Sequence, residues 1–215
     1  MTETTGTRAT AGTTDATRAL IVVDVQPTFC EGGALAVEGG NDVARRIAEF
    51  VAERGDEYAL RVTTQDWHVD PGSHFSDTPD FVDTWPPHGV AGTAEAELHP
   101  AIAGLAFDAG VKKGEYSAAY SGFEGVEGVG DEAAGSRSLE QILRDAGVAA
   151  VDVVGIAESH CVKETAIDAK RLGFDVRVFS DLTVPVSEDL GAAAREAMAA
   201  AGVVQVRSAG ASTAS

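Results

Sequence analysis

The sequence predicts an α/β protein of three layers (α-β-α), in which helices cover both faces of a six-stranded, mostly parallel sheet. Segments rich in β-branched residues alternate with segments whose apolar residues recur at helical spacing, which is typical of parallel sheets. The clearest strand, residues 149–157, is apolar along nearly its whole length, as expected of a strand buried on both faces. The chain's 215 residues suffice for one substantial core but are few for two, so we expect a single domain, and no fixed-period repeat or linker interrupts the alternation.

Six segments have the composition of strands. The first, RALIVVDV, follows a polar N-terminal stretch and is a continuous β-branched run. The third, FDAGVKKG, is weaker because glycine and lysine interrupt it. The six predicted strands are residues 18–25, 57–65, 107–114, 149–157, 174–180 and 203–208.

Four segments have helical periodicity, and several carry residues that begin or end a helix. Asn41 is placed to cap the first helix and Gly55 to end it. Ser138 and Gln141 have the spacing of a capping box at the second, and Gly173 is placed to end the third. The predicted helices are residues 41–55, 138–147, 160–173 and 187–202, with a further short helix expected near 93–98.

Both ends of the chain are polar, so residues 1–17 and 209–215 are predicted to be disordered tails around a domain at 18–208. The first tail lacks the apolar stretch of a secretion signal, and no apolar run approaches the ~20 residues needed to span a bilayer. We therefore expect a cytoplasmic protein with reduced cysteines. The net charge of −18 repels nucleic acid and anionic membranes, and fits either a small or neutral substrate or a salt-rich cell.

Two charged residues and a cysteine stand where predicted strands end. Asp24 places a charge inside an apolar run, where a carboxylate is costly unless it is used or paired. Lys113 ends the third strand, and Cys161 follows the fourth at the start of a predicted helix, where the dipole favours a thiolate. Because ligands of open parallel sheets bind beyond the carboxyl ends of strands, these residues are candidates for one site. Cys161 alone is also consistent with a small buried hydrophobe, and Cys30 is interpreted as structural or incidental.

The loop TQDWHVDPGSHFS concentrates imidazoles and carboxylates. Asp66 and His68 are two residues apart and point the same way on an extended segment, and His74 and His88 follow them. One carboxylate with two or three imidazoles suits one divalent ion such as Zn, Fe or Mn, with coordination positions left open. The alternative is a polar loop whose histidines bond to the backbone, the role that we assign to His99.

Four segments, in this order, resemble the isochorismatase-like cysteine hydrolase family, and within it the nicotinamidases and pyrazinamidases. They are ALIVVDVQPTFCEGGALAVEGG, TQDWHVDPGSHFS with WPPH, KKGEYSAAYSGFEG, and VVGIAESHCVKETAIDA. The resemblance covers residues 19–207 and implies the isochorismatase-like, Rossmann-like form of the predicted fold. The chain departs from the family's pattern at residues 27–28, where Asn-Asp is common, and at 158–159, where Thr-Asp is usual.

The resemblance implies hydrolysis of nicotinamide to nicotinic acid and ammonia through a cysteine thioester in NAD salvage, and hydrolysis of pyrazinamide to pyrazinoic acid. It implies that Asp24 accepts the proton of the nucleophile Cys161 with the help of Lys113. Backbone N–H groups of Ala157 and Cys161 would hold the oxyanion, and the peptide between Ile156 and Ala157 is expected to be cis.

The resemblance also implies a single divalent ion held by Asp66, His68 and His88, with His74 as the ligand that varies most in the family. The expected aromatic walls for the substrate, which ordinary core packing could also explain, are Phe29, Trp85 and Tyr120. Two other functions stay open: a cysteine hydrolase of another small amide or carbamoyl compound, and a non-catalytic metal or thiol protein. No macromolecular partner is implied, and a homo-oligomer is left open.

Overall fold

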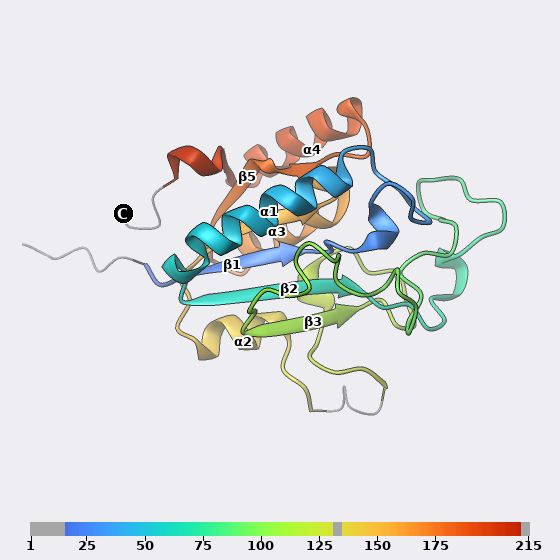
Figure 1. Ribbon diagram of the computed structural model, residues 1–215, viewed down its shortest axis with the longest axis horizontal. Coiled ribbons are helices and arrows are strands. Elements are labelled where there is room, and N and C mark those ends of the chain that lie inside the picture. Colours follow the sequence, from blue (N-terminus) through green and yellow to red (C-terminus); the bar gives the residue numbers. More distant parts are fainter. Residues whose placement is uncertain (1–15, 131–134, 212–215) are drawn as a thin grey trace, which may run out of the picture.

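A computed structural model of the chain describes residues 16–130 and 135–211. In them a six-stranded sheet runs through the middle of the molecule, with helices on both of its faces (Figure 1). The strand order is β3-β2-β1-β4-β5-β6, and each pair of neighbours is parallel. The predicted three-layer α/β fold is therefore confirmed. The strands are β1 (Arg18–Val23), β2 (Leu60–Asp66), β3 (Ala109–Lys113), β4 (Ala150–Ile156), β5 (Asp175–Val184) and β6 (Val204–Val206).

The sheet is buried on both faces, and β1 shows how its sequence achieves this. Ala19, Ile21 and Val23 pack into one hydrophobic core, whereas Leu20 and Val22 pack into the other. Successive side chains of a strand point to opposite faces, so a continuous apolar run serves both cores. One core is covered by α1 (Gly40–Arg54), and the other by α2 (Leu139–Asp145), α3 (Lys163–Arg171) and α4 (Glu188–Ala200).

The predicted capping box of α2 is confirmed, and Gly55 is the C-cap of α1 as predicted, but Asn41 is not the N-cap of α1. Ser138 accepts a hydrogen bond from the N–H of Gln141, whose side chain bonds back to complete a capping box. The N-cap of α1 is Gly39, whose φ of 87° a glycine adopts easily, so Asn41 already lies inside the helix. The Asn41 amide donates instead to the carbonyl of Glu31, which ties the helix to the preceding loop.

Two further elements differ from the prediction. The short helix expected near residues 93–98 is a series of turns, one of them closed by the hydrogen bond from the Ala96 N–H to the Thr93 carbonyl. The fifth strand continues to Val184, beyond its predicted end at residue 180, because its last residues pair with the end of β4 after a shift in register. Pairing with a neighbouring strand can extend a strand past its own apolar pattern.

The described residues include the last two of the predicted N-terminal tail and the first three of the predicted C-terminal tail, and the remaining tail residues lie outside them. The Thr17 carbonyl accepts hydrogen bonds from the start of β4, and Arg54 donates to the carbonyls of Ser208 and Ala211. Both described ends are thus attached to the domain. Within residues 16–130 and 135–211, no helix has the length and apolar character needed to cross a membrane.

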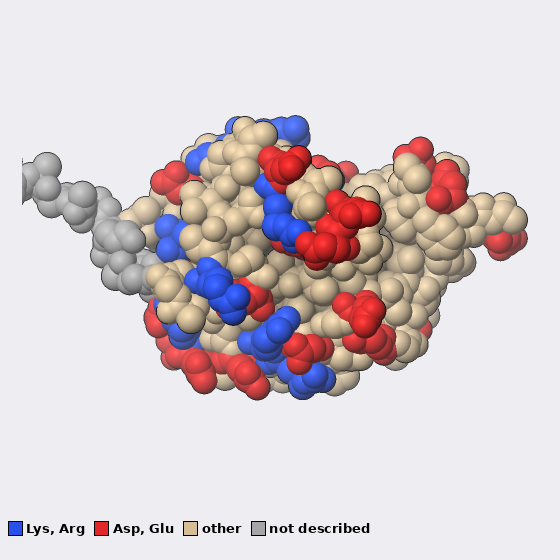
Figure 2. Space-filling view, turned by 90° about the horizontal axis from the view of Figure 1, so that it is seen from above, with Lys and Arg blue, Asp and Glu red and all other residues tan. Residues whose placement is uncertain are grey.

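The strands in Figure 1 point toward the end of the molecule where the long loops between β2 and β3 gather. On the face shown in Figure 2, this right-hand end displays Asp and Glu side chains, while the blue Lys and Arg side chains lie farther left. The distribution agrees with the net charge of −18. An anion approaching this end meets repulsion, so the end is better suited to a neutral ligand or a cation.

At the opposite end of the sheet, a buried carboxylate joins three segments. Asp152 of β4 is fully buried and accepts hydrogen bonds from Arg18, at 2.8 Å, and from two nitrogens of Arg177, at 2.7 and 2.6 Å. The Tyr58 hydroxyl also donates to it, at 2.8 Å. These donors compensate the buried negative charge of the Asp152 carboxylate. Removing the carboxylate would take this acceptor away from the basic side chains around it.

We expect Asp152→Ala to lower the free energy of unfolding by about 3–5 kcal/mol, because removing one member of a buried ion pair leaves the other member uncompensated. Denaturant unfolding measures this difference. Asp168→Ala is the control, since it removes an exposed ion pair of α3 and should cost less than about 1 kcal/mol. A loss as small for Asp152 as for Asp168 would contradict the role of the buried cluster.

Candidate active site

The carboxyl ends of the central strands bring the three predicted catalytic side chains into one buried cluster. Asp24 follows β1, Lys113 ends β3, and Cys161 lies in a turn, Glu158–Val162, that follows β4. The Lys113 Nζ is 3.0 Å from Asp24 Oδ2 and 3.9 Å from Cys161 Sγ. All three side chains are buried. Because neighbouring parallel strands end side by side, residues far apart in the sequence meet here.

The backbone of Asp24 is in the left-handed region, with a φ of 47°, which is uncommon for a residue other than glycine. Its N–H donates to the Thr64 carbonyl at 3.1 Å, and the Thr64 hydroxyl donates to Asp24 Oδ1 at 2.6 Å. These bonds to β2 hold the residue in its strained conformation. They leave Oδ2 facing the Lys113 ammonium. Strained backbone conformations of this kind are frequent at functional sites.

Burial and neighbouring charges set the protonation of the cluster. Burial raises the pKa of the Asp24 carboxyl, although the Lys113 ammonium opposes this. Burial also raises the pKa of the Cys161 thiol, which lies within hydrogen-bonding reach of the Asp24 carboxyl. For Lys113, burial lowers the pKa, but the Asp24 and Asp66 carboxylates outweigh it and raise the pKa well above its ordinary value. The cluster therefore combines a thiol, a carboxylate of increased basicity and a lasting positive charge.

The segment that carries Cys161 differs from the predicted helix start. It is a single π-turn in which the N–H groups of His160 and Val162 both donate to the Ala157 carbonyl, at 3.1 and 3.2 Å. Regular α3 begins two residues after Cys161, so this residue precedes the α-helix and is not part of its first turn. The peptide between Ile156 and Ala157 is cis, as expected.

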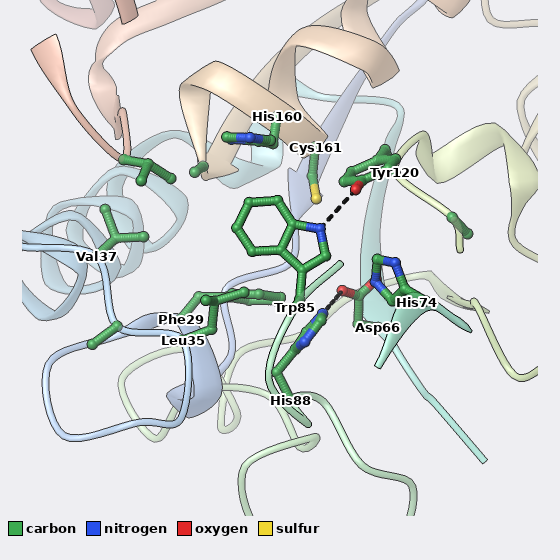
Figure 3. A pocket seen from close by; sticks show the side chains of 14 residues that line it. Phe29, Leu35, Val37, Asp66, His74, Trp85, His88, Tyr120, His160 and Cys161 are labelled. Atoms are coloured by element: carbon green, nitrogen blue, oxygen red, sulfur yellow. Dashed lines mark hydrogen bonds and ion pairs between the residues drawn. The ribbon is translucent and has the colours of Figure 1, made fainter. Parts of the chain in front are cut away.

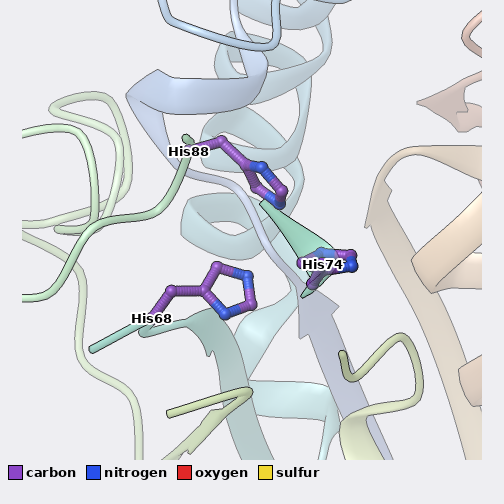
Figure 4. Close-up of side chains that lie close together, drawn as sticks. All are labelled: His68, His74 and His88. Atoms are coloured by element: carbon purple, nitrogen blue, oxygen red, sulfur yellow. The ribbon is translucent and has the colours of Figure 1, made fainter. Parts of the chain in front are cut away.

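Three histidine rings surround one small space beside the cluster (Figure 4). His68, His74 and His88 are buried, and one ring nitrogen of each lies within 4.8 Å of the others. The Nδ1 atoms of His68 and His88 contact the carbonyls of Gly114 and Pro86, at 2.6 and 2.8 Å, which leaves each Nε2 as the free donor atom. Histidine ligands of metals are typically oriented by this kind of contact.

The donor atoms in this group fit a divalent ion. His68 Nε2 and His74 Nδ1 are buried and have no hydrogen-bond partner within the described part of the chain. Such orphaned nitrogens are rare unless a bound ion or water completes them. Burial lowers the pKa of His74 to about 4 and also lowers that of His88, so both rings are neutral at pH 7. The neutral ring is the form that binds a metal.

Asp66 connects the histidines to the catalytic cluster. One carboxylate oxygen bonds to the Lys113 ammonium, and the other lies 3.6 Å from His68 Nε2 and 3.7 Å from His88 Nε2. Burial would raise the pKa of Asp66, but the Lys113 charge and His68 lower it below the ordinary range, so Asp66 is an anion. The four predicted ligands thus lie together. The negative charge among them is that of Asp66, on the side nearest Lys113.

Two residues that we assigned to ordinary roles lie outside this group. The His99 Nε2 is 2.9 Å from the side-chain oxygen of Asn41. Cys30 is buried in the core on the α1 side of the sheet, and burial there raises the pKa of its thiol to about 12. Neither side chain is placed to act with the catalytic cluster.

A pocket opens onto Cys161, His74 and His88 (Figure 3). Phe29, Trp85 and Tyr120 all line it, and the Trp85 Nε1 donates to the Tyr120 hydroxyl at 2.9 Å. The sulfur of Cys161 is directed into this pocket beside the two joined aromatic side chains. Several residues that line the pocket were not predicted from the sequence. Among them, only His160 could have been identified, because it precedes the nucleophile directly. The missed residues are Leu35, Ala36, Val37, Ala119, His160 and Val186.

Comparison with known proteins agrees with this geometry. Residues 18–210 match the isochorismatase domain family. The nicotinamidase/pyrazinamidase of Mycobacterium tuberculosis is 52% identical over 186 residues, which are 86% of this chain and 96% of that protein. A crystal structure of the pyrazinamidase of Pyrococcus horikoshii in complex with zinc is 34% identical, with a TM-score of 0.75 over 89% of this chain and 99% of that one. A structure from L. infantum in complex with nicotinate is 32% identical, with a TM-score of 0.74 over 91% of this chain and 94% of that one. This chain therefore belongs to the isochorismatase family.

Proposed function

We propose that this protein hydrolyses nicotinamide to nicotinic acid and ammonia through a thioester on Cys161. The observation that carries this proposal is the buried cluster of Asp24, Lys113 and Cys161 beside a group of three histidines, with Cys161, His74 and His88 lining one aromatic pocket. The relative named nicotinamidase/pyrazinamidase and the nicotinate-bound neighbour support a pyridine carboxamide as substrate. Pyrazinamide differs from nicotinamide by one ring atom, so the same pocket suits it.

In the first half of the reaction, Asp24 takes the proton of the Cys161 thiol. The raised pKa of the Asp24 carboxyl suits it to this task, and the Lys113 charge, 3.9 Å from the sulfur, stabilises the thiolate that forms. The thiolate attacks the carboxamide carbon. The N–H groups of Ala157 and Cys161, in the turn after β4, stabilise the oxyanion.

In the second half, Asp24 returns its proton to the departing nitrogen, and ammonia leaves a thioester on Cys161. A water molecule then attacks this thioester while Asp24 again accepts a proton. The C–S bond breaks to release nicotinic acid, which ionises to nicotinate, and Asp24 returns the proton taken from water to the Cys161 sulfur. A carboxyl whose pKa is raised toward the working pH can act in both directions, as acid and as base.

His68, His74, His88 and Asp66 would hold one divalent ion, and Zn, Fe and Mn all suit this set of donors. When bound, the ion would contact the ring nitrogen and so orient the carboxamide toward Cys161. The bond between Trp85 and Tyr120 contributes a continuous aromatic wall, against which the flat ring can pack. The remaining lining of the pocket is mostly apolar, which suits the ring of the substrate.

Ammonia release tests this function directly. The purified protein should release ammonia from nicotinamide and lose most of that activity after prolonged chelation. A panel of other small amides and carbamoyl compounds, assayed in parallel, should give lower kcat/KM values. Preference for a compound without the aromatic ring would assign the protein to the other cysteine hydrolases of the family. Failure to release ammonia from any member of the panel would favour a non-catalytic protein.

We expect Asp24→Asn and Lys113→Ala each to lower kcat by about 10²–10⁴-fold, the usual contribution of a group that transfers a proton or supports its transfer. Thermal unfolding of each variant establishes that it is folded. Asp42→Asn, an exposed carboxylate on α1, is the matched control and should keep the wild-type rate. A folded Asp24→Asn variant with a near-normal rate would contradict the proton transfer described above.

We place this reaction in the cytoplasm, where it would return nicotinamide to NAD synthesis. Both cysteines of the chain are free thiols in the structure, and a reducing compartment keeps them so. Asp and Glu side chains are displayed at the end of the molecule toward which the strands point (Figure 2). An acidic surface near the site favours the neutral amide over anions and aids departure of the nicotinate anion. Cells that lack the gene should lose growth on nicotinamide as the pyridine source but not on nicotinic acid.

A further inference from the structure

Glu158 is a buried carboxylate in the turn that carries Cys161, and the mechanism above gives it no role. Its side chain is 3% exposed, and its Oε2 accepts a hydrogen bond of 2.8 Å from the Arg195 Nη1 of α4. Burial raises the pKa of Glu158, and the Arg195 charge opposes that change. The Arg195 side chain is 34% exposed, and an ion pair whose carboxylate is buried seldom stabilises a fold more than apolar side chains of the same size would. The pair therefore calls for an explanation other than global stability.

Arg195 makes two other contacts, an exposed one with Glu188 and one that attaches its backbone to the sheet. Its Nη2 bonds to Glu188, at 2.5 Å, and the Glu188 side chain is 83% exposed. The backbone carbonyl of Arg195 accepts a hydrogen bond of 2.8 Å from the Gln205 side chain of β6. The guanidinium thus extends from α4, which is itself attached to β6 of the sheet. Its contact with Glu158 connects α4 to the turn that carries Cys161.

The turn needs such an anchor because of its geometry. Glu158–Val162 forms a single π-turn, and π-turns are rare and less favourable than regular helix, so surrounding contacts have to hold them. A second bond reaches the turn from the same region, since the Ser159 hydroxyl accepts from the N–H of Val186, at 3.1 Å. Val186 also lines the pocket. The turn is therefore attached to the segment around α4 at two successive residues.

We propose that Glu158 is a positioning residue, whose ion pair with Arg195 holds the π-turn so that the Cys161 sulfur stays beside Lys113 and faces the substrate. The kinetic test of this inference rests on the proposed hydrolysis, whereas the test by alkylation of Cys161 does not. The sulfur is 3.9 Å from the Lys113 ammonium, a separation that a small rotation of the turn would change. Misplacement of a reacting group by about 1 Å can cost 10²-fold in rate.

Two carboxylates on the same arginine provide a matched pair of variants. Glu158→Ala removes the buried partner of Arg195, and Glu188→Ala removes the exposed one. We expect Glu158→Ala to lower kcat by about tenfold to thirtyfold while KM changes less than about twofold, because orientation of the nucleophile is lost and substrate contacts are kept. Glu188→Ala should stay within about twofold of wild type in both constants.

The conservative variant distinguishes positioning from a general effect on folding. The amide oxygen of Glu158→Gln can still accept from Arg195, so this variant should keep at least about one third of the wild-type kcat. If Glu158→Ala does not fold, Glu158→Leu combined with Arg195→Met replaces the pair by apolar side chains, which buried sites generally accept. That double variant should be folded and about tenfold slower. A wild-type kcat in folded Glu158→Ala, or in the folded double variant, with only a lower melting temperature, would overturn the proposal.

Alkylation of Cys161 by iodoacetamide, followed by mass spectrometry in a Cys30→Ser background, tests the positioning without any substrate. We expect Glu158→Ala to react about fivefold more slowly, because a sulfur moved away from Lys113 forms less thiolate, and Glu188→Ala to react like the parent. If wild type does not hydrolyse nicotinamide but this difference is present, the proposed function fails and the positioning role stands. Equal alkylation rates in all variants would overturn the positioning role, even if the enzyme is active.

Discussion

Cys161→Ala is expected to abolish hydrolysis of nicotinamide, because no other side chain of the pocket can form the thioester. Asp24 and Lys113 remain in place in this variant, but they have no sulfur to deprotonate or stabilise. Ammonia release measures the loss. Mass spectrometry of wild type mixed with substrate should show a transient increase in mass on the peptide that contains Cys161, and the variant should show none.

Cys30→Ala is the control for this experiment, since it removes the other thiol of the chain. Cys30 lies in the core on the α1 side, and its pKa of about 12 keeps it protonated. The variant should therefore retain kcat within about twofold and lose only packing energy, as a large-to-small core substitution does. Comparable loss of activity in both variants would show that Cys161 is not the sole nucleophile, or that the two thiols act as a redox pair.

His68→Ala or His88→Ala is expected to lose the bound ion and, with it, most of the activity. Each of these rings presents an Nε2 to the shared space, and Asp66 lies within 3.7 Å of both. Removing one ring leaves too few donors to hold a labile divalent ion tightly. Activity falls although Cys161 is untouched, because a substrate without its anchor loses its orientation to the sulfur. Elemental analysis and ammonia release on the same preparations measure both effects.

Two other histidines complete this experiment. His74→Ala should have a milder effect, because water can take its position on the ion. His99→Ala should leave the metal content unchanged, since His99 bonds to Asn41 and lies outside the group. Wild-type protein that binds no stoichiometric metal after incubation with Zn, Fe and Mn, and still hydrolyses nicotinamide at full rate, would show that these histidines have a structural role.

The sequence alone was sufficient for the layers and the order of the elements. A β-branched run such as β1 must be buried on both faces, and alternation of such runs with amphipathic segments leads to a parallel sheet. Local chemistry was equally readable where a few adjacent residues settle it, as in the capping box of Ser138 and Gln141. Asn41 shows the limit of local reading, because the preceding Gly39 could take the positive φ that begins α1.

The location of the candidate site also followed from the sequence, because parallel strands end at one edge and Asp24 and Lys113 stand at strand ends. The sequence by itself could not determine the distances between those side chains, because packing of the whole core brings their strands together. The 3.0 Å contact between Lys113 and Asp24, the orphaned nitrogen of His68 and the π-turn that contains Cys161 all depend on such packing.

The pair of Glu158 and Arg195 shows most clearly what only the tertiary structure decided. The two residues lie 37 positions apart, and nothing in the residues around either one indicates the other. Periodicity, caps and strand ends are set by neighbouring residues, so a sequence displays them. Which charged side chain is buried against which depends on how α4 packs beside the turn after β4, and this packing is decided by the whole core at once.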